Sequence, residues 1–238
     1  MKLFDAKQRD KDELLTNKVE LFSLLDVIQR NSAKIEIHNY YKGLSITNSG
    51  IIIQIEESQV VINTSYLQQK AIQLEKTLLI VSTALPFTIK TTKINSINFE
   101  KQTVAFEGLK FVKTSPITRK TIRVTVESKQ RVSLFFGENK FQGDIVIEDI
   151  SLDAVKLKLD VLPAGLEIDS EVRLDIVLEL AKQPLIINTK ALLYSKSESK
   201  HSFNLVFTFK NLKKSTLVKY ITRRQMELIR EIKGMKNG

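Results

Sequence analysis

Two nearby stretches, TRKTIRVTV at residues 118–126 and GDIVIEDISLDAVKLKL at residues 143–159, decide how the second half of the chain folds. Apolar residues recur at every second position in residues 122–126 and 155–159, which is the period of β-strands, and residues 145–147 are also apolar. A short polar turn, Asp149–Ser151, separates the two strands predicted within the second stretch. The first stretch places two arginines, Arg119 and Arg123, at the start of the same predicted sheet.

The side chains of these stretches suit a nucleotide that carries phosphate groups. Guanidinium groups such as those of Arg119 and Arg123 bind phosphate oxygens through parallel hydrogen bonds. A carboxylate and a hydroxyl two residues apart, on Asp149 and Ser151, accept from and donate to the edge of a base. Each half alone also has an ordinary explanation: a solvated charge pair for the arginines, and a turn that caps its own amides for Asp149 and Ser151. Lys120 strengthens either interpretation of the arginines.

The order of these residues resembles the signature of PilZ domains, the receptors for cyclic di-GMP. In that signature Arg-x-x-x-Arg precedes Asp/Asn-x-Ser-x-x-Gly by about 25 residues, and the matching residues here are Arg119, Arg123, Asp149 and Ser151. The resemblance implies that the arginines hold phosphates and guanine edges. It implies that Asp149 and Ser151 face the guanine and the nearby backbone. Ala154 stands where the family has glycine.

Two positions depart from the family pattern. Alanine at position 154 is tolerated if the glycine only gives the ligand space, and is unfavourable if the backbone there has a positive φ. Thr118 stands where the family often has a further basic residue, which favours one ligand molecule over a stacked pair and leaves both stoichiometries open. The expected ligand site therefore comprises Thr118, Arg119, Lys120, Arg123, Asp149, Ser151 and Ala154.

The first half of the chain predicts a helix followed by a small barrel. Apolar residues at helical spacing predict a helix over residues 5–30 that ends at residues 31–32. The period then changes to two, and residues 35–112 predict several short strands of a β-barrel. Residues 48–50 are expected to form a turn, and residues 66–74 fit either a helix or a strand.

Residues 114–116, Thr-Ser-Pro, interrupt the strand pattern and mark the expected domain boundary. About seven antiparallel strands follow, and a basic helix over residues 212–233 closes the second domain. Arg223 and Arg224 are expected to be its members nearest the ligand. We expect a mainly β protein with helices at both termini and two small antiparallel β-barrels. Its parts are an N-terminal helix (1–32), an accessory barrel (33–113) and, by resemblance to flagellar-brake (YcgR-like) proteins, a PilZ-type barrel with a C-terminal helix (114–238).

Composition narrows the class of protein. Cysteine is absent, which excludes disulfides, thiolate metal sites and cysteine nucleophiles. The net charge of +10 favours an anionic partner. With no signal-peptide core and no apolar run long enough to span a bilayer, the chain is expected to be cytoplasmic, without membrane insertion. His38 and His201 have no partner at ligand spacing and are expected to be ordinary surface or turn residues; neither an enzyme nor a metal or cofactor site is expected.

Three functions remain open. The first is a cyclic di-GMP receptor that converts nucleotide binding at an interdomain hinge into a domain rearrangement. By resemblance this receptor would regulate motility or adhesion through a protein partner, the flagellar motor at the basal body. The second is a degenerate PilZ protein that binds only other proteins. The third is a binder of single-stranded nucleic acid, which the few aromatic residues disfavour.

Overall fold

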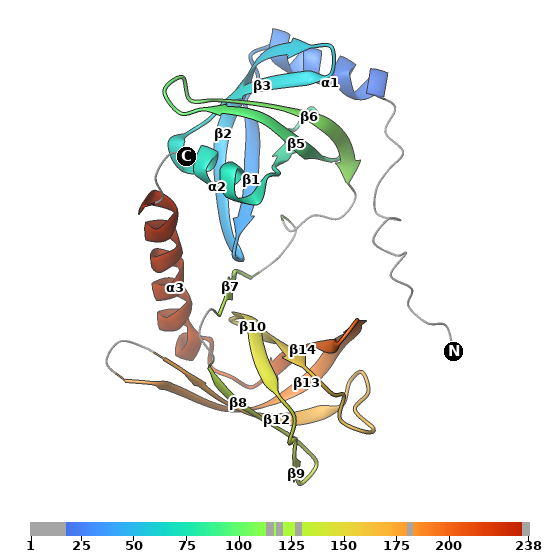
Figure 1. Ribbon diagram of the computed structural model, residues 1–238, viewed down its shortest axis with the longest axis vertical. Helices are drawn as coiled ribbons and strands as arrows, with labels where there is room; N and C mark the ends of the chain where they lie inside the picture. The colour runs from blue at the N-terminus through green and yellow to red at the C-terminus, as the bar shows by residue number, and fades with distance from the viewer. Residues whose placement is uncertain (1–17, 113–116, 118–120, 127–129, 180–182, 235–238) are drawn as a thin grey trace. The chain divides into compact units, whose positions relative to one another are not determined.

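The computed structural model describes residues 18–112, 117, 121–126, 130–179 and 183–234 (Figure 1). Its contacts divide the chain into two units, residues 1–41 with 45–119 and 230–238, and residues 42–44 with 120–229. The expected mainly β fold with helices towards both ends of the chain is confirmed. The boundary predicted at residues 114–116 lies outside the described residues.

The first unit is built on a closed six-stranded barrel in the order β1-β2-β3-β6-β5-β4. Closure leaves no unpaired sheet edge. Its strands are β1 (Ile35–Tyr41), β2 (Leu44–Glu56), β3 (Gln59–Asn63), β4 (Leu79–Val81), β5 (Thr88–Asn98) and β6 (Thr103–Val112). Two helices, α1 (Lys18–Arg30) and α2 (Tyr66–Glu75), accompany it (Figure 1).

Helix α1 behaves as its hydrophobic period predicts. Leu21, Leu25 and Ile28 are buried in the barrel core. The helix ends where expected: Ser32 adopts a φ of 47°, and Ala33 N donates to Ile28 O at 3.0 Å. A left-handed residue just after the last turn is a common helix terminator. The part of the predicted helix before residue 18 lies outside the described residues.

The turn predicted at residues 48–50 is wrong, because β2 runs through it as one strand of 13 residues. The chain turns instead at Lys42-Gly43, where both residues have positive φ (47° and 81°), as a two-residue hairpin turn requires. Gly50 serves close packing: a Cβ there would overlap Asn63 O and lie 2.6 Å from Ile37 Cδ1.

The ambiguous segment at residues 66–74 is a helix, α2. Ser65 caps its N-terminus, with Oγ accepting from Gln68 N, and Lys76 ends it in the left-handed conformation. Its buried face includes Gln68, Gln69 and Lys70, each fully buried. Gln69 Nε2 donates to the carbonyls of Asn98 and Thr103 at 2.8 and 3.0 Å. The hydrophobic period of the sequence did not identify this helix, because much of the face that it buries is polar.

His38 is not the surface or turn residue expected. It lies in β1, is 7% exposed, and has Nδ1 3.0 Å from Thr47 Oγ1 and Nε2 3.2 Å from Glu36 Oε2. Both ring nitrogens are therefore engaged within the barrel.

The second unit is an antiparallel sheet of eight strands in the order β7-β10-β11-β14-β13-β12-β8-β9, which curves around one hydrophobic core (Figure 1). The expected second barrel is thus an eight-stranded sheet with β7 and β9 at its ends. Helix α3 (Lys214–Gly234) adds Leu217, Tyr220 and Ile221 to this core. The strands are β7 (Arg123–Thr125), β8 (Arg131–Phe136), β9 (Asn139–Lys140), β10 (Ile145–Ser151), β11 (Ala154–Leu159), β12 (Glu171–Leu178), β13 (Leu185–Ser199) and β14 (Ser202–Lys210).

Replacing Gly50 by alanine should destabilise the barrel by about 1–3 kcal/mol, because the added methyl group overpacks a strand against backbone. Urea unfolding followed by circular dichroism measures the loss. Gly234→Ala is the matched control, since a Cβ there meets nothing within 4 Å. Equal stability of the two variants would contradict the packing role of Gly50.

Candidate functional site

The two halves of the sequence motif meet where β7 pairs with the end of β10. Arg123 is the direct partner of Ser151, Val124 of Ile150, and Thr125 of Asp149. Residues directly opposite in an antiparallel pair share a face of the sheet. The described residues of the motif therefore lie together at one corner of the second unit, which we call the motif corner: Arg123, Asp149, Ser151 and Ala154.

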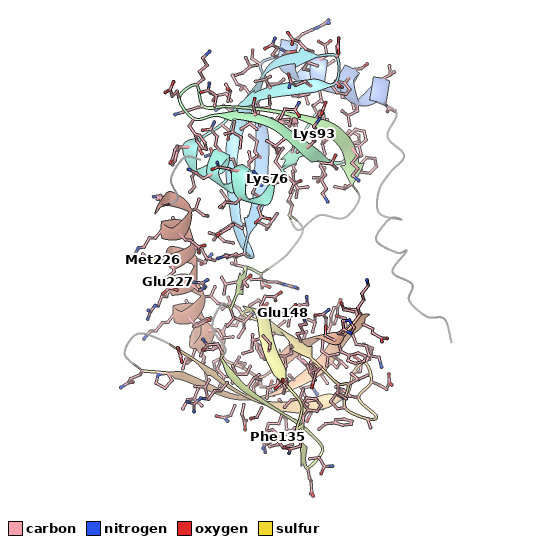
Figure 2. All side chains as sticks on the ribbon, in the orientation of Figure 1. Lys76, Lys93, Phe135, Glu148, Met226 and Glu227 are labelled. Carbon is pink, nitrogen blue, oxygen red and sulfur yellow. The ribbon has the colours of Figure 1, made fainter. Side chains whose placement is uncertain are left out.

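A β-bulge decides which face the motif corner presents. Ile147 and Ile150 are both buried in the core although they are three residues apart. The pairing of β10 with β11 shifts between Ile147 and Asp149, which leaves Glu148 as the extra residue (Figure 2). One extra residue reverses the alternation of side chains beyond it. Asp149 and Ser151 are thereby turned away from the core, to the side opposite Ile150.

Ser151 is occupied by the turn that follows it. Its Oγ accepts from Ala154 N at 3.0 Å and from Asp153 N at 3.3 Å, and donates to Ala154 O at 3.2 Å. A hydroxyl has one donor and two acceptor lone pairs, so all three are used. The side chain is also 1% exposed. The turn expected at Asp149–Ser151 is wrong, because β10 runs through Ser151 and the chain turns at Leu152 and Asp153 before β11. Ser151 holds that turn with its side chain, as the ordinary explanation for this half of the motif states.

Ala154 begins β11 without backbone strain. It pairs with Thr208 of β14 and is not among the residues with positive φ. An alanine in place of the family's glycine therefore costs nothing in backbone conformation here.

Helix α3 contacts strand β7 beside the motif corner through Arg224, which is paired with Glu227 of the same helix. Arg224 Nε donates to Thr125 O at 3.2 Å, and Arg224 Nη1 lies 3.2 Å from Glu227 Oε2. Arg223 Nε donates to Glu227 Oε1 at 2.8 Å. The bond from Arg223 holds the pKa of Glu227 below its ordinary 4.5; partial burial opposes this, and the bond from Arg224 lowers the pKa further.

Sequence reasoning named some of these residues and missed others. Arg224 contacts β7 through Thr125 O, and its expected proximity to the ligand stays a prediction. Glu227, labelled in Figure 2, was missed, although its spacing of four and three residues from the arginines is that of helix ion pairs. Thr118, Arg119 and Lys120 lie outside the described residues.

A pocket of about 590 Å³ lies elsewhere in the second unit. Among its lining residues are Phe136, Phe141 and Pro163. It includes Gly143, before the start of β10, whereas the motif residues stand at the end of that strand. At about 3.4 Å per residue, a strand of this length separates the pocket from the motif corner by about 20 Å. The pocket and the motif are distinct features.

The part of the chain that the structure describes holds no cluster of three or more histidine, cysteine, aspartate or glutamate side chains placed to bind a metal ion. Among the same residues, no helix is both long and apolar enough to cross a membrane.

Comparison with known proteins finds likeness only among solved structures. No family model matches the chain, and no curated protein matches it. The structure of K. pneumonia MrkH with c-di-GMP is 15% identical with a TM-score of 0.43, covering 90% of this chain and 97% of that one. The Bacillus subtilis inhibitor of motility (MotI/DgrA) is 13% identical with a TM-score of 0.41, covering 82% and 97%.

The PilZ domain of Escherichia coli YcgR with c-di-GMP is 16% identical with a TM-score of 0.40, covering 50% of this chain and 99% of that one. The similar structures thus include a PilZ domain with c-di-GMP, the family that the sequence motif resembles. Because the identities are below 25% and the TM-scores below 0.5, these likenesses add nothing to what the motif corner says about function.

Replacing Ser151 by alanine should destabilise the second unit by about 1–3 kcal/mol, because two amides of the β10–β11 turn lose their acceptor. Urea unfolding measures this, with Ser133→Ala on the outward face of β8 as the matched control. If Ser151→Ala unfolded like the wild type, the hydroxyl would not be holding the turn.

The Glu227 ion pairs should make stability depend on pH. Since folding lowers the pKa of Glu227, the pairs stabilise the fold above pH 4.5, and this contribution disappears as the pH falls through the lowered pKa. Glu227→Gln should cost no more than about 1 kcal/mol at neutral pH, because the carboxylate is 38% exposed and screened. Thermal melts from neutral pH to below 4.5 should show the wild type and the variant converging, whereas Glu138→Gln, in an exposed turn, should follow the wild type throughout.

Proposed function

We propose that this protein is a cytoplasmic, non-enzymatic receptor for cyclic di-GMP, with one nucleotide bound at the motif corner. The observation that carries the proposal is the pairing of β7 with β10, which sets Arg123 beside Ser151 and Thr125 beside Asp149. A motif split over some 25 residues of sequence thus becomes one patch on one face. Guanidinium groups suit the phosphates of such a ligand, and a carboxylate suits the donor edge of guanine.

The proposed roles differ between the motif residues. Arg119 and Arg123 hold phosphate, with Thr118 and Lys120 beside them, and Asp149 accepts from guanine. Ser151, whose hydrogen-bonding capacity is used by the turn, acts by holding the backbone of residues 151–154 in place. Ala154 leaves that backbone unstrained.

We further propose that ligand binding changes the arrangement of the two units and thereby the surface offered to a protein partner. The motivation is sequence position: Arg119 and Arg123 follow closely after residues 114–116, the expected domain boundary. For binding to act in this way, the ligand must bind one arrangement more tightly than the other. The resemblance to flagellar-brake proteins makes the flagellar motor the proposed partner, with regulation of motility or adhesion as the result.

The second candidate, a protein-binding module without a nucleotide, is favoured by one specific observation. Ser151 is saturated by its own turn and 1% exposed, so this member of the motif offers a ligand no hydrogen bond. Titration with the nucleotide separates the two candidates.

Isothermal titration calorimetry with cyclic di-GMP should show binding of the wild type. Arg119→Ala and Arg123→Ala should each weaken it at least about tenfold, because each removes charge-assisted bonds to the ligand. Arg30→Ala, which removes an exposed arginine on α1, is the matched control and should bind as the wild type does. Absence of heat with the folded wild type would leave the protein-binding module as the function.

A further inference from the structure

A row of four basic residues and one phenylalanine crosses the outward face of the second unit's sheet. Four successive pairings join Lys140 to Phe135, Phe135 to Arg173, Arg173 to Lys190, and Lys190 to Lys210. Directly paired residues share a face, and neighbouring residues such as Leu134, Leu174 and Ala191 point into the core. We call these five residues the cationic row: Lys140, Phe135, Arg173, Lys190 and Lys210.

The cationic row is exposed and carries more positive than negative charge. The side chains of Arg173, Lys190 and Lys210 are 57%, 70% and 41% exposed. The carboxylates beside them are Glu171 and Asp175, the latter 3.8 Å from Arg173 Nε. Four cations thus stand beside two anions, which leaves an excess of positive charge along a line of neighbouring strands.

The cationic row already binds one carboxylate of the same chain. Glu171 lies between two of its lysines, with Oε1 2.8 Å from Lys190 Nζ and Oε2 2.9 Å from Lys210 Nζ. These two bonds hold the pKa of Glu171 down at about 2. Adjacent lysines on paired strands therefore form a seat that matches the two oxygens of one carboxylate.

The distance between neighbouring residues of the cationic row determines which secondary structure of a partner can place its carboxylates along the row. Neighbouring strands lie about 4.8 Å apart, so the row spans about 19 Å in four steps. Side chains three and four residues apart on a helix are separated by about 5–6 Å, which nearly matches this step. Side chains on one face of an extended strand are separated by about 6.6–6.8 Å, which does not.

The aromatic member of the row argues against nucleic acid. Single strands bind such surfaces by stacking their bases on open aromatic rings. Phe135, labelled in Figure 2, has the guanidinium carbon of Arg173 3.9 Å from its ring centroid. That ring face is covered, and the stacked arginine is held with its charge directed along the row.

We propose that the cationic row is the docking surface for an acidic α-helix of a protein partner, whose carboxylates repeat every three or four residues. The inference deepens the proposed function by giving the partner's chemistry, and it rests on that function only for the existence of a protein partner. The row also ends near the motif corner, because Lys210 lies two residues beyond Thr208, the direct partner of Ala154.

The test uses the full chain without nucleotide and a fluorescently labelled helical peptide with glutamate at every fourth position on an alanine and glutamine background. Fluorescence anisotropy at low salt should show binding that Lys190→Glu weakens at least about tenfold, since it places a like charge in the row. Lys200→Glu changes the net charge equally in the turn before β14 and should alter binding less than about twofold. Melting curves confirm that both variants are folded.

Three results would overturn the proposal. The first is equal weakening by the two substitutions, which would mean that only net charge matters. The second is equal binding of a peptide of the same composition with its glutamates spread around the helix. The third is tighter, Lys190-dependent binding of single-stranded DNA or of vesicles of phosphatidylserine. Calorimetry of Lys190→Glu with cyclic di-GMP distinguishes failure of the docking surface from failure of the nucleotide site, because that variant should bind the nucleotide as the wild type does.

Discussion

The pairing of the three residues of β7 with the end of β10 is the constraint on which the candidate site depends. It brings together residues that are far apart in sequence, and the bulge at Glu148 decides that they face away from the core. Without that extra residue, Asp149 and Ser151 would continue the alternation of Ile147 and point inward, where an unpaired carboxylate is costly. The bulge is therefore as much a part of the site as the side chains that carry its chemistry.

The same sheet organises two patches of different chemistry. At the motif corner, the carbonyl of Thr125 is bonded by Arg224, which also contacts Glu227 of its own helix. Along the cationic row, the lysines outnumber the carboxylates, and the excess charge is left to solvent. The pairing register sets the positions of the two patches on the sheet: Ala154 of the motif corner pairs with Thr208, and Lys210 of the cationic row follows two residues later on the same strand. A strand slip of one residue would turn both patches to the other face.

Much of the fold was predictable because its signals are local. Alternating hydrophobicity located the strands of the second unit, and the helical period located α1 and α3. The turn expected at Asn48–Gly50 was wrong because a turn-forming composition does not distinguish a bend from a glycine that lets two strands pack closely. Helix α2 was ambiguous because it buries glutamines and a lysine: Gln69 bonds to carbonyls of distant strands, whereas Lys70 bonds to Gln73 of the same helix. At the site, the three-residue spacing between Ile147 and Ile150 is compatible with the bulge. The sequence also offered a turn capped by Ser151 as the ordinary explanation, but only the geometry of the turn shows that every hydrogen bond of the hydroxyl is used.

The seat formed by Lys190 and Lys210 affects the residence time of any partner carboxylate that binds there. It is already filled by Glu171, so an incoming carboxylate exchanges with a resident one and leaves no bare charge behind when it departs. This exchange lowers the binding free energy gained from an incoming carboxylate, and it also speeds the dissociation of that carboxylate. Such a surface favours short-lived, repeated binding over a permanent complex. This is the kinetic behaviour expected of an interaction that is regulated.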